Sequence, residues 1–487
     1  MAKKANNKKP KGELGLLSLT ALVVGSMIGG GIFNLMQDMS AEASLLAIII
    51  GWLIAGVGMV LLAFSFQNLN RKRPDLDAGV YSYAEAGFGK FMGFSSAWGY
   101  WISAWIGNVS YAALLFGSVA YFFSIFDDGR NTASVIGASV MLWLVAWLIN
   151  RGIKTSSLSN LIVTIAKLVP IGIFVVAIMA AFKYDLLTAD VWGKMLEGSP
   201  DLMTQIKSTT LITVWVFIGV EGAVIFSGRA KKRSDVGKAT FIGLSLVTAI
   251  YLLTTILSLA VLSQPEIAEL SQPAMAGVLE SVVGKWGAIL VNLGLVVSVL
   301  GGWLAWTMFA VELPYQAAKN KTFPKWFAKE NSRGVPTTSL VITSVLIQLF
   351  LLSFLIPNLN AYSFLFSLAS SAILVPYLFV ALFQLKSSWQ EKASTPGRTR
   401  NMVIGLLATV YAVWLLYAAD VNYMLLSVLL YAPGAVIYAI MRIYQKKKPF
   451  TMYELVVVVV LALLAIYAVS QLAISGSDLN LILFPAE

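Results

Sequence analysis

Apolar stretches long enough to cross a lipid bilayer recur along the whole chain. A helix needs about 20 residues to cross a hydrocarbon core that is roughly 30 Å thick. Of the 487 residues, 58% are hydrophobic and 12% are charged, which leaves too little polar surface for a water-soluble globule of this length. Because the apolar runs are continuous and do not alternate with polar residues, they favour helices over a β-barrel. The sequence therefore predicts an all-α integral membrane protein.

We expect about thirteen transmembrane helices from these runs. The first run is too long for a signal peptide and has a Gly-rich centre, so we expect it to remain as the first span. The predicted spans are 15–37, 44–67, 92–124, 133–150, 157–182, 208–228, 239–262, 286–313, 337–357, 360–385, 402–419, 423–444 and 452–473.

The basic residues are distributed unevenly between the two sides of the membrane. The chain has 35 Lys and Arg against 24 Asp and Glu, a net charge of +11. Most of the basic residues fall in segments that share the side of the N-terminal tail, residues 1–14, which places this tail in the cytoplasm and the tail 474–487 outside. We therefore interpret the excess as membrane topology and contact with anionic lipid, with no nucleic-acid partner. The predicted location is the bacterial cytoplasmic membrane.

The absence of Cys and His from the sequence limits the possible chemistry. It excludes disulfides, thiolate or imidazole metal sites, and catalysis by Cys or His. The spans hold only isolated charges such as Lys167, Glu221 and Glu312, whereas an intramembrane enzyme needs paired catalysts. A channel would favour rings of charged residues or repeated pore motifs, and the sequence has neither. We expect no enzyme activity, no metal and no cofactor. A sensor that binds its ligand without transporting it remains an alternative.

The first predicted span contains three adjacent glycines, Gly29, Gly30 and Gly31. Each Gly destabilises a helix by about 1 kcal/mol relative to Ala, so the three together favour an interruption near the middle of the membrane. An unwound backbone is tolerated there only where it lines a cavity or is buried in protein. The alternative is close packing of an unbroken helix through small residues.

The sixth predicted span contains a second candidate interruption, where Gly219 and Gly222 bracket Glu221. Interrupted helices at matching positions predict an inverted repeat of five plus five helices, with substrate bound between the breaks. Free N–H groups at the first break could hold a substrate carboxylate, and free carbonyls its amino group. The repeats are predicted at 15–182 and 208–386, with additional helices at 401–473.

Several motifs resemble those of the amino acid/polyamine/organocation superfamily, and within it the basic amino acid/polyamine antiporters. The match covers the first twelve spans, and the segments Val24–Gly31 and Ala84–Gly89 look most like arginine/ornithine antiporters. The motifs that carry the resemblance are Gly29–Phe33, Arg73–Asp75, Gly79–Tyr83, Trp105–Asn108, Phe217–Glu221 and Gly301–Trp303.

The resemblance implies a LeuT-like 5+5 inverted-repeat fold, in which spans 1, 2, 6 and 7 move against spans 3, 4, 8 and 9. Gly30 stands where the similar arginine/agmatine antiporter has Ser, so here the backbone alone would hold the substrate carboxylate. Trp303 would cover the cationic end of the substrate, since an indole face attracts cations. The implied substrate-binding residues are Ser26, Gly29, Gly30, Gly31, Asn108, Trp215, Ile218, Trp303 and Ser367.

Two charged residues inside spans have two interpretations each. Lys167 either donates hydrogen bonds to the unwound first helix or, as the resemblance implies, replaces the sodium ion of coupled relatives. Glu221 is either a gating or coupling carboxylate or a static acceptor for freed N–H groups.

The resulting hypothesis is electroneutral exchange of arginine for ornithine by alternating access. The same scaffold could exchange lysine for cadaverine, agmatine for putrescine or tyrosine for tyramine, and a sensor of amino acids remains an alternative. A homodimer is a further expectation, and the thirteenth span has no assigned role.

Overall fold

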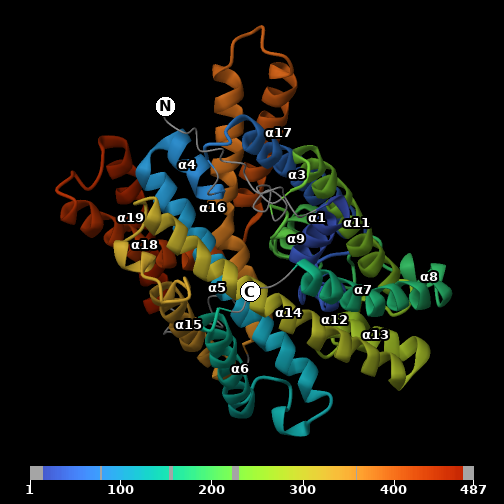
Figure 1. The fold of residues 1–487 in the computed structure, drawn as a ribbon. Coiled ribbons are helices and arrows are strands. Elements are labelled where there is room, and N and C mark those ends of the chain that lie inside the picture. The colour runs from blue at the N-terminus through green and yellow to red at the C-terminus, as the bar shows by residue number, and fades with distance from the viewer. Residues whose placement is uncertain (1–14, 77–78, 153–156, 222–229, 358, 475–487) are drawn as a thin grey trace.

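A computed structural model describes residues 15–76, 79–152, 157–221, 230–357 and 359–474. These residues form helices joined by loops, and an isolated β-bridge pairs Glu330 with Pro336. Figure 1 shows the helices packed side by side in one bundle. The prediction of an all-α protein is confirmed.

Eleven helices of the described chain are long and apolar enough to cross a membrane. They coincide with the predicted spans other than the first and the sixth. They are α3 (Leu45–Lys72), α5 (Lys90–Ala120), α6 (Thr132–Asn150), α7 (Ser157–Ala180), α11 (Arg233–Ser258), α14 (Lys285–Lys319), α15 (Thr337–Leu351) extended by the 3-10 helix η5 (Leu352–Leu355), α16 (Ala361–Gln390), α17 (Arg398–Ala418), α18 (Val421–Tyr444) and α19 (Met452–Ile474).

The first and sixth predicted spans are interrupted. In the first, α1 (Leu16–Met27) is followed by a bend, the short 3-10 helix η1 (Gly31–Phe33) and α2 (Leu35–Glu42). In the sixth, α9 (Leu202–Phe217) ends inside the apolar run, and residues 222–229 lie outside the described part. Because neither is a continuous spanning helix, the total of thirteen stays a prediction.

Short helices lie in the connections between the spans. Polar residues cap several of the longer helices: the Asn131 side chain accepts from the N–H of Ser134, and Asp201 accepts from Met203 and Thr204. The short elements in the connections are α4 (Val80–Phe88), η2 (Ser124–Phe126), α8 (Tyr184–Leu187), α12 (Gln264–Ala268), α13 (Ala274–Val283) and η4 (Lys325–Ala328).

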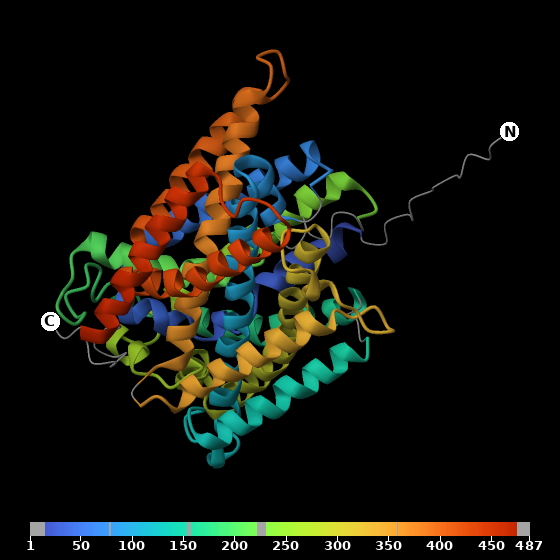
Figure 2. The same ribbon diagram turned by 90° about the vertical axis from the view of Figure 1, so that its left-hand side faces the viewer.

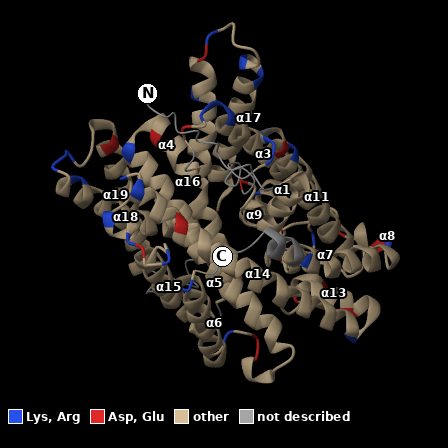
Figure 3. Ribbon diagram, viewed as in Figure 1, with Lys and Arg blue, Asp and Glu red and all other residues tan. Residues whose placement is uncertain are grey.

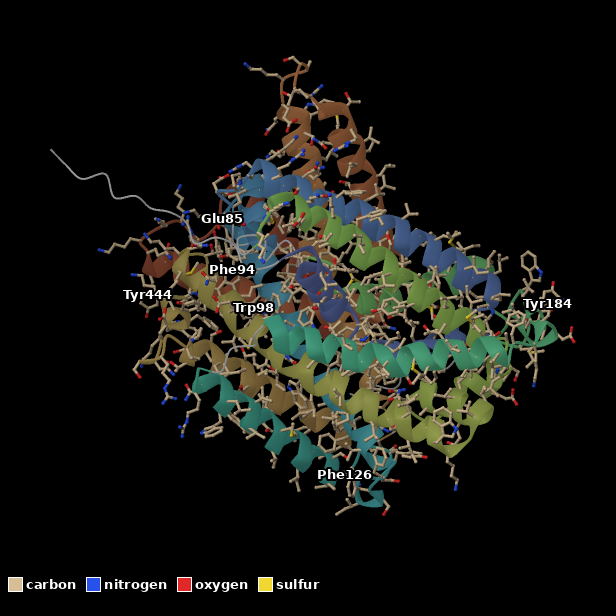
Figure 4. All side chains as sticks on the ribbon, turned by 45° about the vertical axis from the view of Figure 1, so that its right-hand side comes forward. Glu85, Phe94, Trp98, Phe126, Tyr184 and Tyr444 are labelled. Carbon is tan, nitrogen blue, oxygen red and sulfur yellow. The ribbon has the colours of Figure 1, made fainter. Side chains whose placement is uncertain are left out.

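Helices α5 and α16 form the centre of the molecule. In the most apolar stretch of each, 89% of the residues of α5 and 78% of those of α16 are buried, against 6% for α19. Figure 2 shows α5, in light blue, running through the middle of the bundle. Figure 4 shows Glu85, Phe94 and Trp98 near one end of this helix and Phe126 beyond the other. Side chains of α5 can therefore reach the interrupted spans from the scaffold.

Charged residues gather at the ends of the helices and in the connections, and the middle of the bundle carries few (Figure 3). This is the distribution that a hydrocarbon core requires, because a charge in lipid is costly unless it faces protein or water. The basic segments at residues 71–73, 231–232 and 446–448 lie in such connections or at helix ends.

Candidate functional site

The first interruption lies at the glycines that the sequence indicates. Helix α1 ends at Met27, Ile28 has an extended backbone, and regular geometry resumes with η1 at Gly31. Ile28, Gly30 and Phe33 are all buried. The prediction of a broken first helix is confirmed, and the alternative of an unbroken helix packed through small residues is wrong here.

Side chains from other helices donate to the carbonyls that the break exposes. The Lys167 ammonium of α7, 2% exposed, donates to the carbonyl of Gly25 at 2.7 Å and to that of Ile28. The Ser298 hydroxyl of α14 donates to the carbonyl of Gly29 at 3.1 Å. A buried carbonyl without a donor costs about 1–3 kcal/mol, so these contacts stabilise the unwound segment.

Not all N–H groups of the same segment have a hydrogen-bond acceptor. The N–H groups of Phe33 and Asn34 donate to the carbonyls of Gly30 and Gly31 at 3.0 and 3.1 Å. In contrast, the N–H groups of Gly30, Gly31 and Ile32 donate to no acceptor in the described part of the chain. Three successive free N–H groups at the start of a helical segment form an anion-binding arrangement. The site can therefore accept a carboxylate through backbone alone.

The packing around the three glycines leaves no room for side chains. A Cβ atom at Gly30 would lie 2.8 Å from Leu114 Cδ2, and one at Gly31 would lie 2.9 Å from Trp215 Nε1. A Cβ atom at Gly29 would overlap the hydroxyl of Tyr111. These close approaches explain the three glycines, because any side chain would push the neighbouring helices apart.

The second interruption begins where α9 ends at Phe217. The N–H of Ile218 still donates to the carbonyl of Val214 at 3.1 Å, and Gly219 then adopts a φ of +106°, a conformation that side chains disfavour. A Cβ atom at Gly219 would lie 2.8 Å from the carbonyl oxygen of Ser26. The helix thus ends at the predicted position, and its continuation lies outside the described residues.

The two interruptions contact each other directly. The Ser26 hydroxyl lies 2.8 Å from the carbonyl oxygen of Gly219 and 2.9 Å from that of Val23. The Tyr251 hydroxyl of α11 lies 3.0 Å from the carbonyl of Met27 and 2.9 Å from that of Val216. Since each hydroxyl has one proton, each is shared between its two carbonyls. Ser26, predicted as a substrate contact, here joins the two breaks.

Glu221 connects the second interruption to the scaffold. Its carboxylate is 1% exposed and accepts hydrogen bonds from the hydroxyls of Tyr100 on α5 and, at 3.2 Å, Tyr377 on α16. No Lys or Arg pairs with it among the described residues. The structure therefore places Glu221 between the second interruption, α5 and α16, and its coupling role stays a prediction.

Trp215 lies between the two interruptions and α5. Its ring makes an edge contact with Tyr111 at 5.6 Å between centroids and stacks on Phe366 at 6.1 Å. The same ring is next to Gly107, where a Cβ atom would lie 3.2 Å from it. Trp215 thus fills the space beside Gly31, as a residue that covers a bound substrate would.

Other predicted contacts are buried and keep polar atoms without a partner. Asn108 is 0% exposed, and its Nδ2 donates to the carbonyl of Ala104 at 3.2 Å while its Oδ1 has no partner in the described chain. The Nε1 of Trp303, also 0% exposed, has none either. Asn108 follows Gly107, which contacts Trp215, and Trp303 follows Gly302, which lies beside Tyr111. Buried polar atoms of this kind are rare unless a ligand or water binds them.

The tenth predicted span contributes a row of small polar residues. Ser367 is 7% exposed, and its carbonyl accepts from the Ser371 hydroxyl at 3.0 Å. Further along α16, the hydroxyl of Ser370 has no partner among the described residues. Ser367 is buried in the protein, and a substrate contact at Ser367 stays a prediction.

Sequence reasoning did not find three residues that shape the site. Tyr111 packs against Gly29, Tyr251 bridges the two breaks, and Ser298 donates to Gly29. Each lies in a continuous apolar run, where a tyrosine or serine looks like packing. No pattern along the chain shows which helix such a side chain faces, so the sequence carries no signal that could have indicated them.

The described residues contain no group of three or more Asp and Glu that could hold a metal ion. The polar groups around the breaks are carbonyls, N–H groups, hydroxyls, one amide, the Lys167 ammonium and the Glu221 carboxylate. This set suits a small zwitterion, whose carboxylate binds N–H donors and whose cationic groups bind carbonyl oxygens and aromatic faces.

Comparisons with known proteins agree with this arrangement. A family model described as amino acid permease matches residues 14–444. An arginine/ornithine antiporter of Pseudomonas aeruginosa is 48% identical over 467 residues, covering 93% of this chain and 97% of the antiporter. An arginine/agmatine antiporter of Chlamydia caviae is 40% identical over 474 residues, covering 95% of this chain and 97% of that protein.

Among solved structures, the crystal structure of MhsT in complex with L-phenylalanine is similar in fold. Its TM-score is 0.54 at 17% sequence identity, and the match covers 83% of this chain and 98% of MhsT. This likeness concerns the fold alone, and it confirms the predicted LeuT-like class.

Proposed function

The chain belongs to the amino acid permease family, and from this premise we propose that it exchanges arginine for ornithine across the bacterial cytoplasmic membrane. Arginine and ornithine each carry one net positive charge near neutral pH. A one-for-one exchange therefore moves no net charge, and the two substrate gradients drive it without an ion. The sequence similarity to the Pseudomonas aeruginosa antiporter supports this substrate pair.

The observation that carries the proposal is the asymmetry of the first break. Its carbonyls at Gly25, Ile28 and Gly29 have donors from Lys167 and Ser298, whereas the N–H groups of Gly30, Gly31 and Ile32 have no acceptor among the described residues. The α-carboxylate of an amino acid supplies the missing acceptor. Both arginine and ornithine carry this carboxylate.

Aromatic and polar side chains complete the proposed site. Trp215 covers the bound backbone of the substrate, and Trp303 offers an indole face to its cationic end. The unpaired Asn108 Oδ1 is an acceptor for a substrate N–H. We propose Ser26, Gly29, Ile218 and Ser367 as the surrounding walls, and Glu221 as the carboxylate that couples the second break to the scaffold.

The mechanism follows from the bonds between helices. Substrate bound at Gly30 and Gly31 sits between a moving bundle and the scaffold formed by α5 and α14. Tyr111 and Ser298 belong to the scaffold and contact the break itself, so a change of tilt between the two parts must alter these contacts. Alternating access then exposes the same site to either side in turn.

Arginine/agmatine exchange is the second candidate, favoured by the 40% identity to the Chlamydia caviae protein. Agmatine lacks the carboxylate, so it would leave the three N–H groups unpaired. The structure at the first break therefore favours ornithine over agmatine as the exchanged product.

Counterflow in proteoliposomes tests the substrate pair. Vesicles containing purified protein are loaded with ornithine, agmatine, lysine, cadaverine or no substrate, and uptake of radiolabelled arginine is followed. We expect ornithine to support the fastest uptake and empty vesicles to support none. Uptake without internal substrate would contradict exchange, and faster uptake with agmatine would replace the proposed pair.

The membrane topology and the partners complete the proposal. We propose that the N-terminus lies in the cytoplasm, together with the basic segments near residues 71–73, 231–232 and 446–448. The exposed apolar faces, above all that of α19, contact lipid. The repeat boundaries 15–182 and 208–386 and a homodimer belong to the same proposal.

A further inference from the structure

The last helix, α19, combines an exposed body with a buried first turn. It lies beyond the residues that the family model matches, which end at 444. Only 6% of the residues in its apolar stretch are buried. Its Glu454, however, is 4% exposed. A buried carboxylate at the start of a helix that otherwise faces lipid requires an explanation.

Glu454 accepts hydrogen bonds from the N-terminal turns of two helices. One carboxylate oxygen accepts from the N–H of Thr451 at 2.8 Å, as in a capping box of its own helix. The other accepts from the N–H of Phe91 at 3.1 Å, in the first turn of α5. Both helix ends carry partial positive charge, so one carboxylate satisfies two free N–H groups and interacts favourably with both.

Tyr453, the residue before Glu454, binds the other helix of the α4–α5 corner, the junction of these two helices at Gly89. The Tyr453 hydroxyl donates to the carbonyl of Phe88, the last residue of α4, at 2.8 Å. Between α4 and α5, Gly89 has a φ of +97°, and a Cβ atom there would overlap the Tyr453 hydroxyl. Tyr453 and Glu454 therefore contact both helices that meet at Gly89.

Neighbouring contacts fix this corner to the rest of the molecule. Phe91 packs on Tyr438 and Phe450, with centroid distances of 5.2 and 5.3 Å. The Lys386 ammonium of α16 donates to the carbonyl of Gly87 at 2.6 Å. Figure 1 shows α4, α18 and α19 on one side of the bundle, and α5 running through its middle.

Helix α4 is also bonded to the connection that follows α14. Thr322 donates to the Glu85 carboxylate at 2.9 Å, and Asn320 donates to the Tyr81 hydroxyl at 2.9 Å. The α4–α5 corner thus joins α5, α14 and α16, which are the helices that bring Tyr111, Ser298, Trp303 and Ser367 to the site.

We propose that Glu454 is a positioning residue for transport: by capping α5 from α19, it holds the α4–α5 corner so that the scaffold stays rigid while the bundle moves. The proposal assigns to the thirteenth predicted span a role in the scaffold, whereas the sequence left it without one. This role rests on the proposed exchange function, because one of its tests measures transport. The other test measures amide hydrogen exchange and does not depend on that function.

The test compares Glu454→Ala and Glu454→Gln with Asp420→Ala in full-length protein. Asp420 is a matched control, because its carboxylate caps its own helix α18, through the N–H groups of Asn422 and Tyr423, and no other helix in the described chain. We expect Glu454→Ala to lower the maximal exchange rate per folded transporter about tenfold. The half-saturation concentration for arginine should stay within about twofold, since no substrate contact changes.

Hydrogen exchange of the same detergent-purified proteins needs no substrate. In Glu454→Ala, peptides covering residues 88–95 should exchange faster, while the Asp420→Ala protein keeps its protection there. Glu454→Gln retains one acceptor oxygen and should give an intermediate loss in both measurements, which covers the case in which the Ala variant does not fold.

Two results would overturn the proposal. One is a Glu454→Ala or Glu454→Gln protein that exchanges substrate at the wild-type rate with faster amide exchange at residues 88–95. The other is unchanged amide exchange at residues 88–95 in both variants, which would show that Glu454 does not protect the N-terminal turn of α5. If wild-type protein transports neither arginine nor ornithine, the proposed function fails, while the hydrogen-exchange result still decides the cap.

Discussion

Individual residues at the first break determine which backbone groups are free. Lys167 and Ser298 each donate to carbonyls of the unwound segment, and each comes from a different helix. The three N–H groups from Gly30 to Ile32 keep their hydrogen-bonding capacity for a ligand. The polarity of the site therefore follows from which side chains surround it: donors are supplied by the protein, and an acceptor must be supplied by the substrate.

Gly31→Ala should abolish most transport while leaving the fold intact. The added Cβ would lie 2.9 Å from Trp215 Nε1 and 3.0 Å from Val216 Cγ1, so the two breaks must separate. Overpacking of this kind costs about 1–3 kcal/mol. Binding of radiolabelled arginine to purified protein should weaken at least about tenfold, which corresponds to about 1.4 kcal/mol.

Gly172→Ala is the control for this substitution. Nothing lies within 4 Å of a Cβ atom at Gly172, which is on the exposed face of α7. It should bind arginine as the wild type does, with equal or slightly higher stability. Wild-type binding by Gly31→Ala would contradict the close approach of the two breaks.

Lys167→Met should eliminate exchange. It removes the donor from the buried carbonyls of Gly25 and Ile28, at a cost of about 1–3 kcal/mol for each group left unsatisfied. Counterflow of arginine against ornithine measures the effect. Lys194→Met, at an exposed loop lysine, should exchange normally. Exchange at the wild-type rate by Lys167→Met would show that the first break does not depend on this ammonium.

Part of the site could be predicted from residue types alone. Three adjacent glycines in an apolar run indicate an interruption because they weaken any helix, and a lone lysine in a span must find carbonyl partners. The partners Tyr111, Tyr251 and Ser298 could not be predicted, because one tyrosine or serine in an apolar run does not show which helix it faces. Their roles depend on how α5, α11 and α14 pack around the break.

At the scale of elements, the two interruptions form one unit. The Ser26 hydroxyl of α1 contacts the carbonyl of Gly219, and the Tyr251 hydroxyl of α11 contacts that of Val216, both near the end of α9. Since α1, α9 and α11 carry the first, sixth and seventh predicted spans, these bonds lie within the group of helices expected to move together. Glu221 makes the contrasting contacts, to Tyr100 on the scaffold helix α5 and to Tyr377 on α16, which carries the tenth predicted span.

Tyr251→Phe and Ser26→Ala should each slow exchange several-fold, and their effects should not be additive. Each removes one hydroxyl shared between carbonyls of the two breaks, so the second substitution acts on a connection that the first has already loosened. Initial rates of counterflow for the two single variants and the double variant give the coupling. Tyr467→Phe, on the exposed face of α19, serves as the control. If the fractional rate of the double variant equals the product of the fractional rates of the two single variants, the two hydroxyls support separate structures.

The positions of the continuous helices were predictable because length and apolarity alone determine a transmembrane span. The predicted span 360–385 corresponds to α16 (Ala361–Gln390), and 92–124 to α5 (Lys90–Ala120). The corner at Gly89 was not predicted: Glu454 lies far from Phe91 in the sequence, and no pattern along the chain pairs a carboxylate with an N–H group of another helix.

At the scale of the whole molecule, α5 and α16 form a buried centre to which the interrupted helices attach. Most residues of α19, in contrast, are exposed, as expected for a helix at the edge of the bundle. The likeness to MhsT extends over 83% of the chain and supports this architecture. In the proposed function, the scaffold helices and the bundle joined through its two breaks are the two parts that alternating access requires.

Exchange should not require sodium. The Lys167 ammonium donates to the carbonyls of Gly25 and Ile28, and we propose that it provides there the positive charge that a bound cation would supply. Counterflow in sodium chloride and in choline chloride of equal ionic strength should give equal initial rates. A strict dependence on sodium would contradict the proposed role of this lysine.

The central claim is that free backbone N–H groups at the first break hold the substrate carboxylate. Displacement of radiolabelled arginine by arginine and by argininamide, in which the carboxylate is replaced by a neutral amide, tests it most directly. A charged hydrogen-bonding group contributes about 1.5–3 kcal/mol, so argininamide should compete at least about tenfold more weakly than arginine. Equal competition by the two compounds would contradict the claim.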